Sequence, residues 1–232
     1  MIKIYPDSSR FAGDRGWLRS RFSFSFGDYY DETNTEFGAL RVFNDDIIQG
    51  GHGFGAHPHR EMEIVSVVLK GQLKHEDNTG HTAVTGFGGV QRMSAGTGII
   101  HSEVNPSDEE CRLLQIWFTP GESKLPPSYE TTSYDPAAMK NALLPIVSHQ
   151  SSIHVAHIHQ DLTMYLSQLD PGQSLRFQQP EGRRIYLFVI EGGLLLEGSI
   201  QLEEQDSARI TEQPELTMES ESGAMFMLID LP

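Results

Sequence analysis

The chain has 232 residues, of which 38% are hydrophobic, 21% are charged and 22 are glycine. These proportions exclude a disordered or fibrous protein, and the length suits one large β domain or two domains of about 110 residues. The net charge of -15 disfavours direct binding to nucleic acid, because such a surface repels phosphate groups.

Alternating hydrophobicity predicts strands in the first half of the chain. Residues 22–26 read Phe-Ser-Phe-Ser-Phe, a pattern typical of a half-buried strand. A second strand is predicted over residues 38–43, before a turn at Asn44-Asp45-Asp46. Residues 61–77 contain two β-rich runs separated by Gly71, which predicts a hairpin or a bulged strand pair.

A stretch with four prolines, residues 121–148, predicts a connection between two halves, with a short helix around residues 137–144. Strand-like runs then return at 163–169, 185–190, 194–196 and 224–231. We therefore expect an all-β protein with an N-terminal domain over 1–125, a connecting segment over 126–148 and a C-terminal domain over 149–232.

The two halves contain an internal repeat, because residues 50–73 align without gaps with residues 171–194. The alignment pairs Gly51 with Gly172, Gly71 with Gly192, and the apolar run 64–69 with 185–190. The polar residues of the first copy are replaced in the second: His57 by Gln178, His59 by Pro180, Glu63 by Arg184 and, after a short gap, His101 by Met218 and Glu103 by Ser220. The repeat predicts one metal-binding half and one scaffold half.

Two pairs of residues have the spacing of metal ligands. His57 and His59 lie two apart, so on a strand they share one face with Cα atoms about 6.6 Å apart. His101 and Glu103 repeat this spacing, and antiparallel pairing would bring three imidazoles and one carboxylate together. Such a set suits Fe(II), Mn, Co, Ni, Cu or Zn. Glu63 shares the parity of the first pair, so spacing leaves Glu63 and Glu103 as alternatives for the carboxylate ligand.

The remaining histidines are expected to lie outside the site. His157 and His159 have the same spacing but align with no ligand position of the first copy, so we interpret them, with nearby His154, as surface or structural residues. Four others lie in or near predicted turns, where solvation is the simpler account: His52, His75, His81 and His149.

A single cysteine, Cys111, excludes an internal disulfide and a thiolate metal cluster and suits a reducing compartment. We interpret it as a small buried hydrophobic residue. The N-terminus has no apolar signal segment and no apolar run approaches the roughly 18 residues of a membrane span, so we expect a cytoplasmic protein without membrane contact.

Several motifs resemble known families. Gly51, His57, His59 and Glu63 have the spacing of the first cupin motif, and Gly98, His101 and Asn105 match the end of the second. The closer resemblance is to the pirin family, which is built from two cupin-like domains in tandem. It rests on GWL (16–18), FSFGDYYD (24–31), FGALRVFNDD (37–46), HPHREMEIVSVVLKG (57–71), HED (75–77), MSAGTGIIHSE (93–103) and QIWF (115–118).

The resemblance implies two jelly-roll β-barrels with short helical connections and a metal inside the first barrel. It implies the ligands His57, His59, His101 and Glu103, with iron as the usual metal, and leaves Glu63 to orient a ligand histidine. Several pirins are similar to quercetin 2,3-dioxygenases, which implies a flavonol and O₂ as substrates and Glu103 as the base. Other pirins imply an alternative, a metal-containing regulatory protein that binds a protein partner through its surface.

Overall fold

The structure is a computed structural model that describes residues 1–232, and it contains 22 strands and two short 3₁₀ turns. The predicted all-β fold is confirmed. No helix of the structure has the length and apolar character needed to cross a membrane. The predicted short helix is a 3₁₀ turn, η2 (Pro136–Met139), whose first turn is capped by the Asp135 side chain on the Ala137 amide at 2.9 Å.

The chain forms two compact units that are not simple halves of the sequence. The N-terminal unit contains Phe11–Tyr134 and His149–Gln160, and the C-terminal unit contains Met1–Arg10, Asp135–Ser148 and Asp161–Pro232. The linear boundaries expected from the sequence therefore differ from the observed units at residues 1–10 and 149–160. The expected connecting segment is divided between the units, with 126–134 in the N-terminal unit and 135–148 in the C-terminal unit.

Backbone hydrogen bonds explain why these segments belong to a different unit than expected. Strand β1 (Ile2–Tyr5) pairs along its whole length with β20 (Ser207–Thr211), which ties the N-terminus to the C-terminal unit. In the N-terminal unit, the amide of Gly121 donates to the carbonyl of His159 at 2.6 Å. Strand β12 (Ser128–Ser133), inside the expected connecting segment, pairs with β9 of the N-terminal unit.

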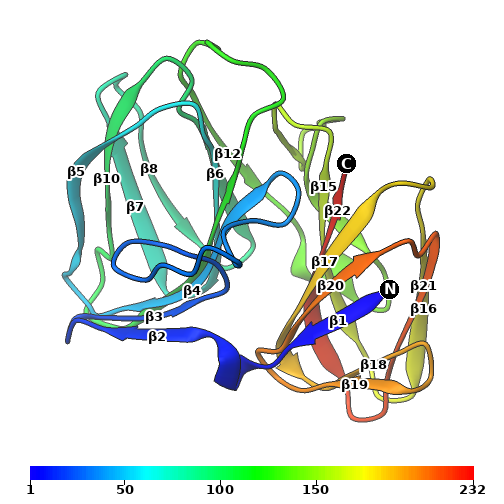
Figure 1. The fold of residues 1–232 in the computed structure, drawn as a ribbon. Coiled ribbons are helices and arrows are strands. Elements are labelled where there is room, and N and C mark those ends of the chain that lie inside the picture. Colours follow the sequence, from blue (N-terminus) through cyan, green and yellow to red (C-terminus); the bar gives the residue numbers. More distant parts are fainter. The chain divides into compact units, whose positions relative to one another are not determined.

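The N-terminal unit consists of two sheets, with strand orders β12-β9-β6-β11-β4-β3-β2 and β5-β10-β7-β8 (Figure 1). Its strands are β2 (Phe11–Asp14), β3 (Leu18–Phe22), β4 (Leu40–Ile48), β5 (Gly53–His59), β6 (Glu63–Lys70), β7 (Gln72–Asp77), β8 (Thr82–Gly86), β9 (Gly89–Ser94), β10 (Ile99–Val104), β11 (Cys111–Phe118), β12 and β14 (Ala156–His157).

The β6 and β7 runs do not form the predicted hairpin, because they belong to different sheets. Gly71 lies between them with a φ of +75°, and a Cβ atom there would lie 2.6 Å from the backbone oxygen of Glu110. Only glycine fits this conformation and this approach without strain. Gly71 is thus the point at which the chain passes from one sheet to the other.

Two further local predictions were wrong. Strand β3 ends at Phe22, and Phe24 and Phe26 lie beyond it, with Phe26 forming only an isolated bridge to Tyr29. The expected turn at residues 44–46 instead lies inside β4, which runs on to Ile48 because it pairs with β11 on one side and β3 on the other. Polar residues that resembled a turn are therefore presented on the faces of a central strand.

The C-terminal unit repeats this architecture, with sheet orders β1-β20-β17-β22-β15-β13 and β16-β21-β18-β19 within the unit. Its remaining elements are η1 (Asp7–Ser9), β13 (Leu144–Ser148), β15 (Thr163–Leu169), β16 (Gln173–Gln178), β17 (Arg184–Gly192), β18 (Leu194–Leu196), β19 (Ile200–Leu202), β21 (Glu215–Ser220) and β22 (Ala224–Leu231). The strands predicted in this half are all present.

The glycines that the repeat aligns share their backbone conformation. Gly51 and Gly172 have φ values of +71° and +75°, and Gly71 and Gly192 have values of +75° and +79°.

The interior of the C-terminal unit is a continuous hydrophobic cluster that includes Met218. Met218, which the repeat aligns with His101, lies opposite Leu175 on the neighbouring strand. His101 itself lies opposite His57, which the repeat aligns with Gln178. The ungapped part of the repeat aligns Leu175 with Phe54, and Phe54 lies opposite Glu103. Met218 also lies opposite Leu196, which the repeat aligns with His75, and His75 lies opposite Glu103. Met218 therefore occupies the position of Glu103 rather than that of His101, and the gapped part of the repeat alignment was wrong by two residues.

Candidate metal centre

Strands β5 and β10 bring the two predicted ligand pairs together. They pair antiparallel, with His57 directly opposite His101. The ring centroids of His57 and His101 lie 4.5 Å apart. The ring centroid of His59 lies 4.8 Å from that of His57 and 4.9 Å from that of His101. Potential ligand atoms of the three residues all lie within 4.8 Å of one another. Three imidazoles can thus reach one ion.

Glu103 lies further along β10, beyond a register shift that sets it opposite Phe54. Its carboxylate accepts hydrogen bonds from the Ser66 hydroxyl at 3.1 Å and from the Gln115 amide at 2.7 Å. Glu103 groups with His101 and His75 in a second set of potential ligand atoms within 4.8 Å. His101 belongs to both sets and therefore connects the carboxylate to the other two histidines.

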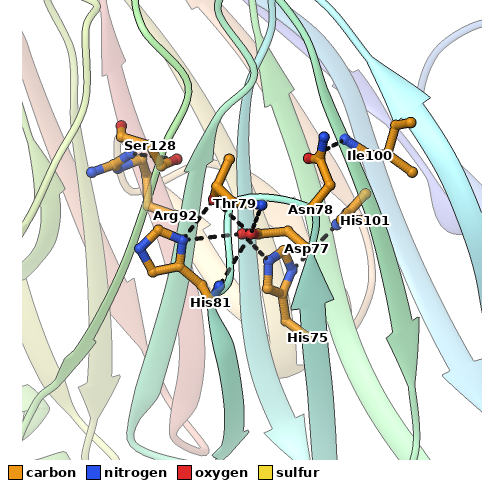
Figure 2. A network of polar contacts seen from close by, with 9 residues as sticks. All are labelled: His75, Asp77, Asn78, Thr79, His81, Arg92, Ile100, His101 and Ser128. Carbon is orange, nitrogen blue, oxygen red and sulfur yellow. Dashed lines mark hydrogen bonds and ion pairs between the residues drawn. The ribbon is translucent and has the colours of Figure 1, made fainter.

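Hydrogen bonds determine which ring nitrogen of His57 and which of His101 is free to bind a metal. Nδ1 of His57 donates to the carbonyl of Gly55 at 2.8 Å, which leaves Nε2 of His57 as the acceptor. His75 donates from Nε2 to Asp77 at 3.0 Å, so its Nδ1 accepts from Nδ1 of His101 at 3.2 Å (Figure 2). The lone pair of His101 is therefore on Nε2.

Asp77 anchors this chain of hydrogen bonds because it remains ionised. It also accepts from the Thr79 amide at 2.8 Å, from the Thr79 hydroxyl at 2.6 Å and from the His81 amide at 3.2 Å (Figure 2). Burial alone would raise the pKa of Asp77, but the hydrogen bonds from His75, Thr79 and His81 outweigh it and hold that pKa well below the usual range. A permanent acceptor thus orients His75, and His75 orients His101.

Two of the candidate ligands, His59 and His101, carry the neutral form that metals require. Burial, followed by the neighbouring His57, lowers the pKa of His59 to about 4. Burial, then His57 and His59, lowers the pKa of His101 to about 3. Both rings are neutral at pH 7 and can donate a lone pair. Burial raises the pKa of Glu103, against the opposing hydrogen bond from Ser66.

One further observation indicates that the four candidate side chains suit a divalent metal. Nε2 of His101 is buried and has no hydrogen-bond partner. Leaving a buried polar atom unpaired costs about 1–3 kcal/mol, and a cation bound by this nitrogen would remove the penalty. Imidazole nitrogens with one carboxylate oxygen are the donor set of transition-metal sites.

A cavity of about 230 Å³ opens beside these groups. His57, His59, His101 and Glu103 all line it, together with the aromatic side chains of Phe26, Phe54 and Trp117. The Trp117 ring packs edge-on against His59, with centroids 4.8 Å apart. The cavity thus combines polar ligand atoms with apolar walls, as small-molecule sites usually do.

Glu63 does not orient a ligand histidine, and that expectation was wrong. Its carboxylate accepts from the Ser94 hydroxyl at 2.9 Å and from the backbone amide of His159 at 3.2 Å. The ring centroids of His157 and His159 lie 4.7 Å apart, but neither residue belongs to a group of three potential metal ligands. Glu63 instead holds the segment 149–160 within the N-terminal unit.

His75 lies beside the candidate ligands although the sequence did not count it among them, and its membership of the pirin-like segment HED (75–77) was the one indication. It was expected to be solvated, yet it is 1% exposed and stacks on Tyr129 with centroids 4.0 Å apart. The spacing of His75 and Asp77, two apart like both ligand pairs, also places them on one face of β7.

Comparison with known proteins agrees with this architecture. The Pirin family profile matches residues 6–118, and the profile for the quercetinase C-terminal cupin domain matches residues 145–231. Quercetin 2,3-dioxygenase of Escherichia coli strain K12 is 37% identical over 233 residues, covering 100% of this chain and 99% of that protein.

Two crystal structures have nearly the same fold. YhhW from Escherichia coli superposes with a TM-score of 0.95 at 36% identity, covering 100% of this chain and 98% of that one. The bacterial pirin YhhW in complex with nickel(II) superposes with a TM-score of 0.94 at 35% identity, covering 100% and 99%. The chain therefore belongs to the pirin family and is built from two cupin domains.

Proposed function

We propose that His57, His59, His101 and Glu103 hold one divalent metal ion and that the protein is a metal-dependent dioxygenase that opens a flavonol ring with O₂. The observation that carries this proposal is the unpaired, buried Nε2 of His101, a residue that lines one cavity with the other three side chains. Relatives named quercetin 2,3-dioxygenase support the reaction, and the nickel complex of a related pirin supports a divalent ion.

Fe(II) is our proposed resident metal, and the donor set also accepts Mn, Co, Ni, Cu or Zn. When bound, such an ion would supply charge stabilisation and open positions for the oxygen atoms of a flavonol and of O₂. The C-terminal unit is proposed to act as a scaffold without metal ligands, supported by its hydrophobic interior. The single cysteine supports a reducing compartment, so we also propose a cytoplasmic location.

Glu103 is proposed to accept the proton of the flavonol hydroxyl group. Its burial raises its pKa, which makes the carboxylate a better base than an exposed one. Ser66 and Gln115 each donate to one of its oxygens and hold the group in place while its charge changes. Phe26, Phe54 and Trp117 provide flat apolar walls that suit an aromatic substrate and exclude water.

The test begins with metal analysis of protein purified without added metal. Iron-loaded protein should then consume quercetin and release carbon monoxide. Glu103→Gln should keep its metal, because the three histidines remain, and lose activity by about 100-fold or more. Glu63→Gln is the matched control, because Glu63 is also a buried carboxylate but does not line the cavity.

Two outcomes would overturn the proposal. In one, wild-type protein loaded with each of the metals named above releases no carbon monoxide. In the other, Glu103→Gln turns over quercetin as fast as the wild type. The first outcome would favour the alternative of a regulatory protein that acts through its surface.

A further inference from the structure

The cavity at the candidate metal centre adjoins a second, larger one. The second cavity has a volume of about 430 Å³, and the two share the side chains of Phe26, Asn44, Asp46 and Phe54 in their walls. The metal-side cavity, at about 230 Å³, falls below the roughly 300–1,000 Å³ usual for a drug-sized ligand. The combined volume of the two cavities falls within that range.

A continuous series of aromatic contacts connects the two spaces. Trp117 packs edge-on against Phe26 with centroids 5.2 Å apart, and Phe26 packs edge-on against Phe22 at 5.3 Å. Phe22 in turn stacks on Phe11 at 5.7 Å. Trp117 lines the metal-side cavity, Phe11 and Phe22 line the second, and Phe26 lines both. A planar aromatic molecule would meet ring surfaces along its whole length.

One row of side chains crosses the larger sheet beneath these cavities. Neighbouring strands set Gln91 against Ser66, Ser66 against Gln115, Gln115 against Asn44, and Asn44 against Phe22. Directly opposed residues of antiparallel strands have Cα atoms about 4.5–5.5 Å apart, so the row is continuous. It changes from polar to aromatic residues after Asn44.

Every polar residue of this row except Asn44 has a side-chain hydrogen bond. Gln91 donates to the Leu73 carbonyl at 3.1 Å, and Ser66 and Gln115 both donate to Glu103. Asn44 is 1% exposed, and its side-chain oxygen is buried without a partner. The side-chain oxygen of Gln91 also lacks a partner, but Gln91 lines neither cavity. A buried amide oxygen without a partner destabilises a fold, so its presence at the junction of two cavities indicates a binding role.

We infer that the second cavity binds the pendant ring of the substrate and that Asn44 recognises a hydroxyl group on that ring. This inference rests on the proposed function and deepens it. The chelating oxygens of a flavonol lie in the metal-side cavity near Glu103, and the pendant ring extends past Phe26 into the larger space. The Asn44 amide, which both donates and accepts, pairs with a phenolic hydroxyl there. Asn44 is thus a specificity-determining residue.

The test measures equilibrium binding without turnover. Nickel-loaded protein is titrated by calorimetry in the absence of O₂ with quercetin, whose pendant ring carries hydroxyls, and with galangin, whose pendant ring carries none. Asn44→Leu removes the amide at similar size. We expect it to weaken quercetin binding about tenfold and to leave galangin binding within about twofold, because only quercetin loses a hydrogen bond.

Thermal unfolding of metal-free protein supplies an independent measurement. Asn44→Leu should unfold at the same temperature as the wild type or higher, since it removes an unpaired buried amide. Ser167→Ala is the matched control, because Ser167 also has a buried hydroxyl without a partner but lines neither cavity. Its affinity for both flavonols should equal that of the wild type.

Equal quercetin affinity of wild type and Asn44→Leu would overturn the inference, as would an equal loss of quercetin and galangin binding. If Asn44→Leu does not fold, the wild type decides, since equal affinity for the two flavonols also overturns it. Binding that depends on Asn44 without carbon monoxide release would sustain the inference and overturn the dioxygenase proposal. Carbon monoxide release with binding independent of Asn44 would do the reverse, and absence of binding by either flavonol would overturn both.

Discussion

Nδ1 of His75 lies 3.2 Å from Nδ1 of His101, so a residue on β7 determines which nitrogen of a candidate ligand on β10 remains for a metal. The direction of this hydrogen bond follows from Asp77. Its ionised carboxylate can only accept, so Nε2 of His75 donates to it and Nδ1 of His75 is left as an acceptor. Without His75, His101 could carry its proton on either nitrogen. Metal affinity should therefore depend on a residue that does not have to touch the metal.

Replacing His75 by Phe tests this dependence. Phenylalanine can keep the stacking on Tyr129 but removes both ring nitrogens, so Nδ1 of His101 loses its acceptor. We expect metal affinity, measured by competition with a chelator, to fall about 10- to 100-fold. His154→Phe is the control, because His154 is exposed and its ring donates to the Ser133 carbonyl, away from Asp77 and His101. Unchanged affinity in His75→Phe would refute the positioning role.

The two pairs of histidines with identical spacing should behave differently. We expect His57→Ala and His59→Ala to lose bound metal, because each removes one of three converging imidazoles. His157→Ala and His159→Ala should keep the full metal content, since they belong to no such set. Elemental analysis after dialysis measures both. Metal lost from the second pair of variants and retained by the first would contradict the assignment.

Acidification should destabilise the metal-free protein through its buried histidines. The pKa of His101 falls from 6.5 to about 3 on folding, so between these values the unfolded chain binds more protons than the folded one. The free energy of unfolding therefore decreases as the pH falls below about 6.5, by about 1–2 kcal/mol between pH 7 and pH 5 for this residue alone. Urea titrations at the two pH values measure the change.

The matched variant for the pH experiment is His101→Gln, which removes the titrating ring. Its stability should fall less than that of the wild type over the same interval, by the amount attributed to His101. Parallel decreases in the two proteins would show that other groups cause the acid sensitivity.

Cys111 should be inert in the folded protein. It lies fully buried on β11, and burial, followed by the nearby charge of Glu103, raises the pKa of its thiol to about 12. The reactive thiolate is therefore scarce at pH 8, and reagents cannot reach it. A colorimetric thiol reagent should detect no free thiol in native protein and one thiol per chain in guanidinium chloride. Rapid modification of the native protein would contradict the burial.

Periodicity and spacing along the chain were enough to predict the class of the fold and the residue types of the candidate centre. Period-two alternation indicates strands, and it also shows that residues two apart share a face, so the spacing alone pairs His57 with His59 and His101 with Glu103. The internal repeat showed that the second copy lacks these residues. Local periodicity and residue chemistry were sufficient for both conclusions.

The pairing of the strands, and therefore the neighbours of each side chain, became known from the folded structure. That structure placed Asn44 inside β4 rather than in a turn, passed the chain between sheets at Gly71, paired Glu63 with Ser94, and buried His75 behind His101. Strand periodicity specifies a face but not the neighbour on that face. Those neighbours come from distant parts of the chain, and their pairing depends on the register and packing of whole sheets.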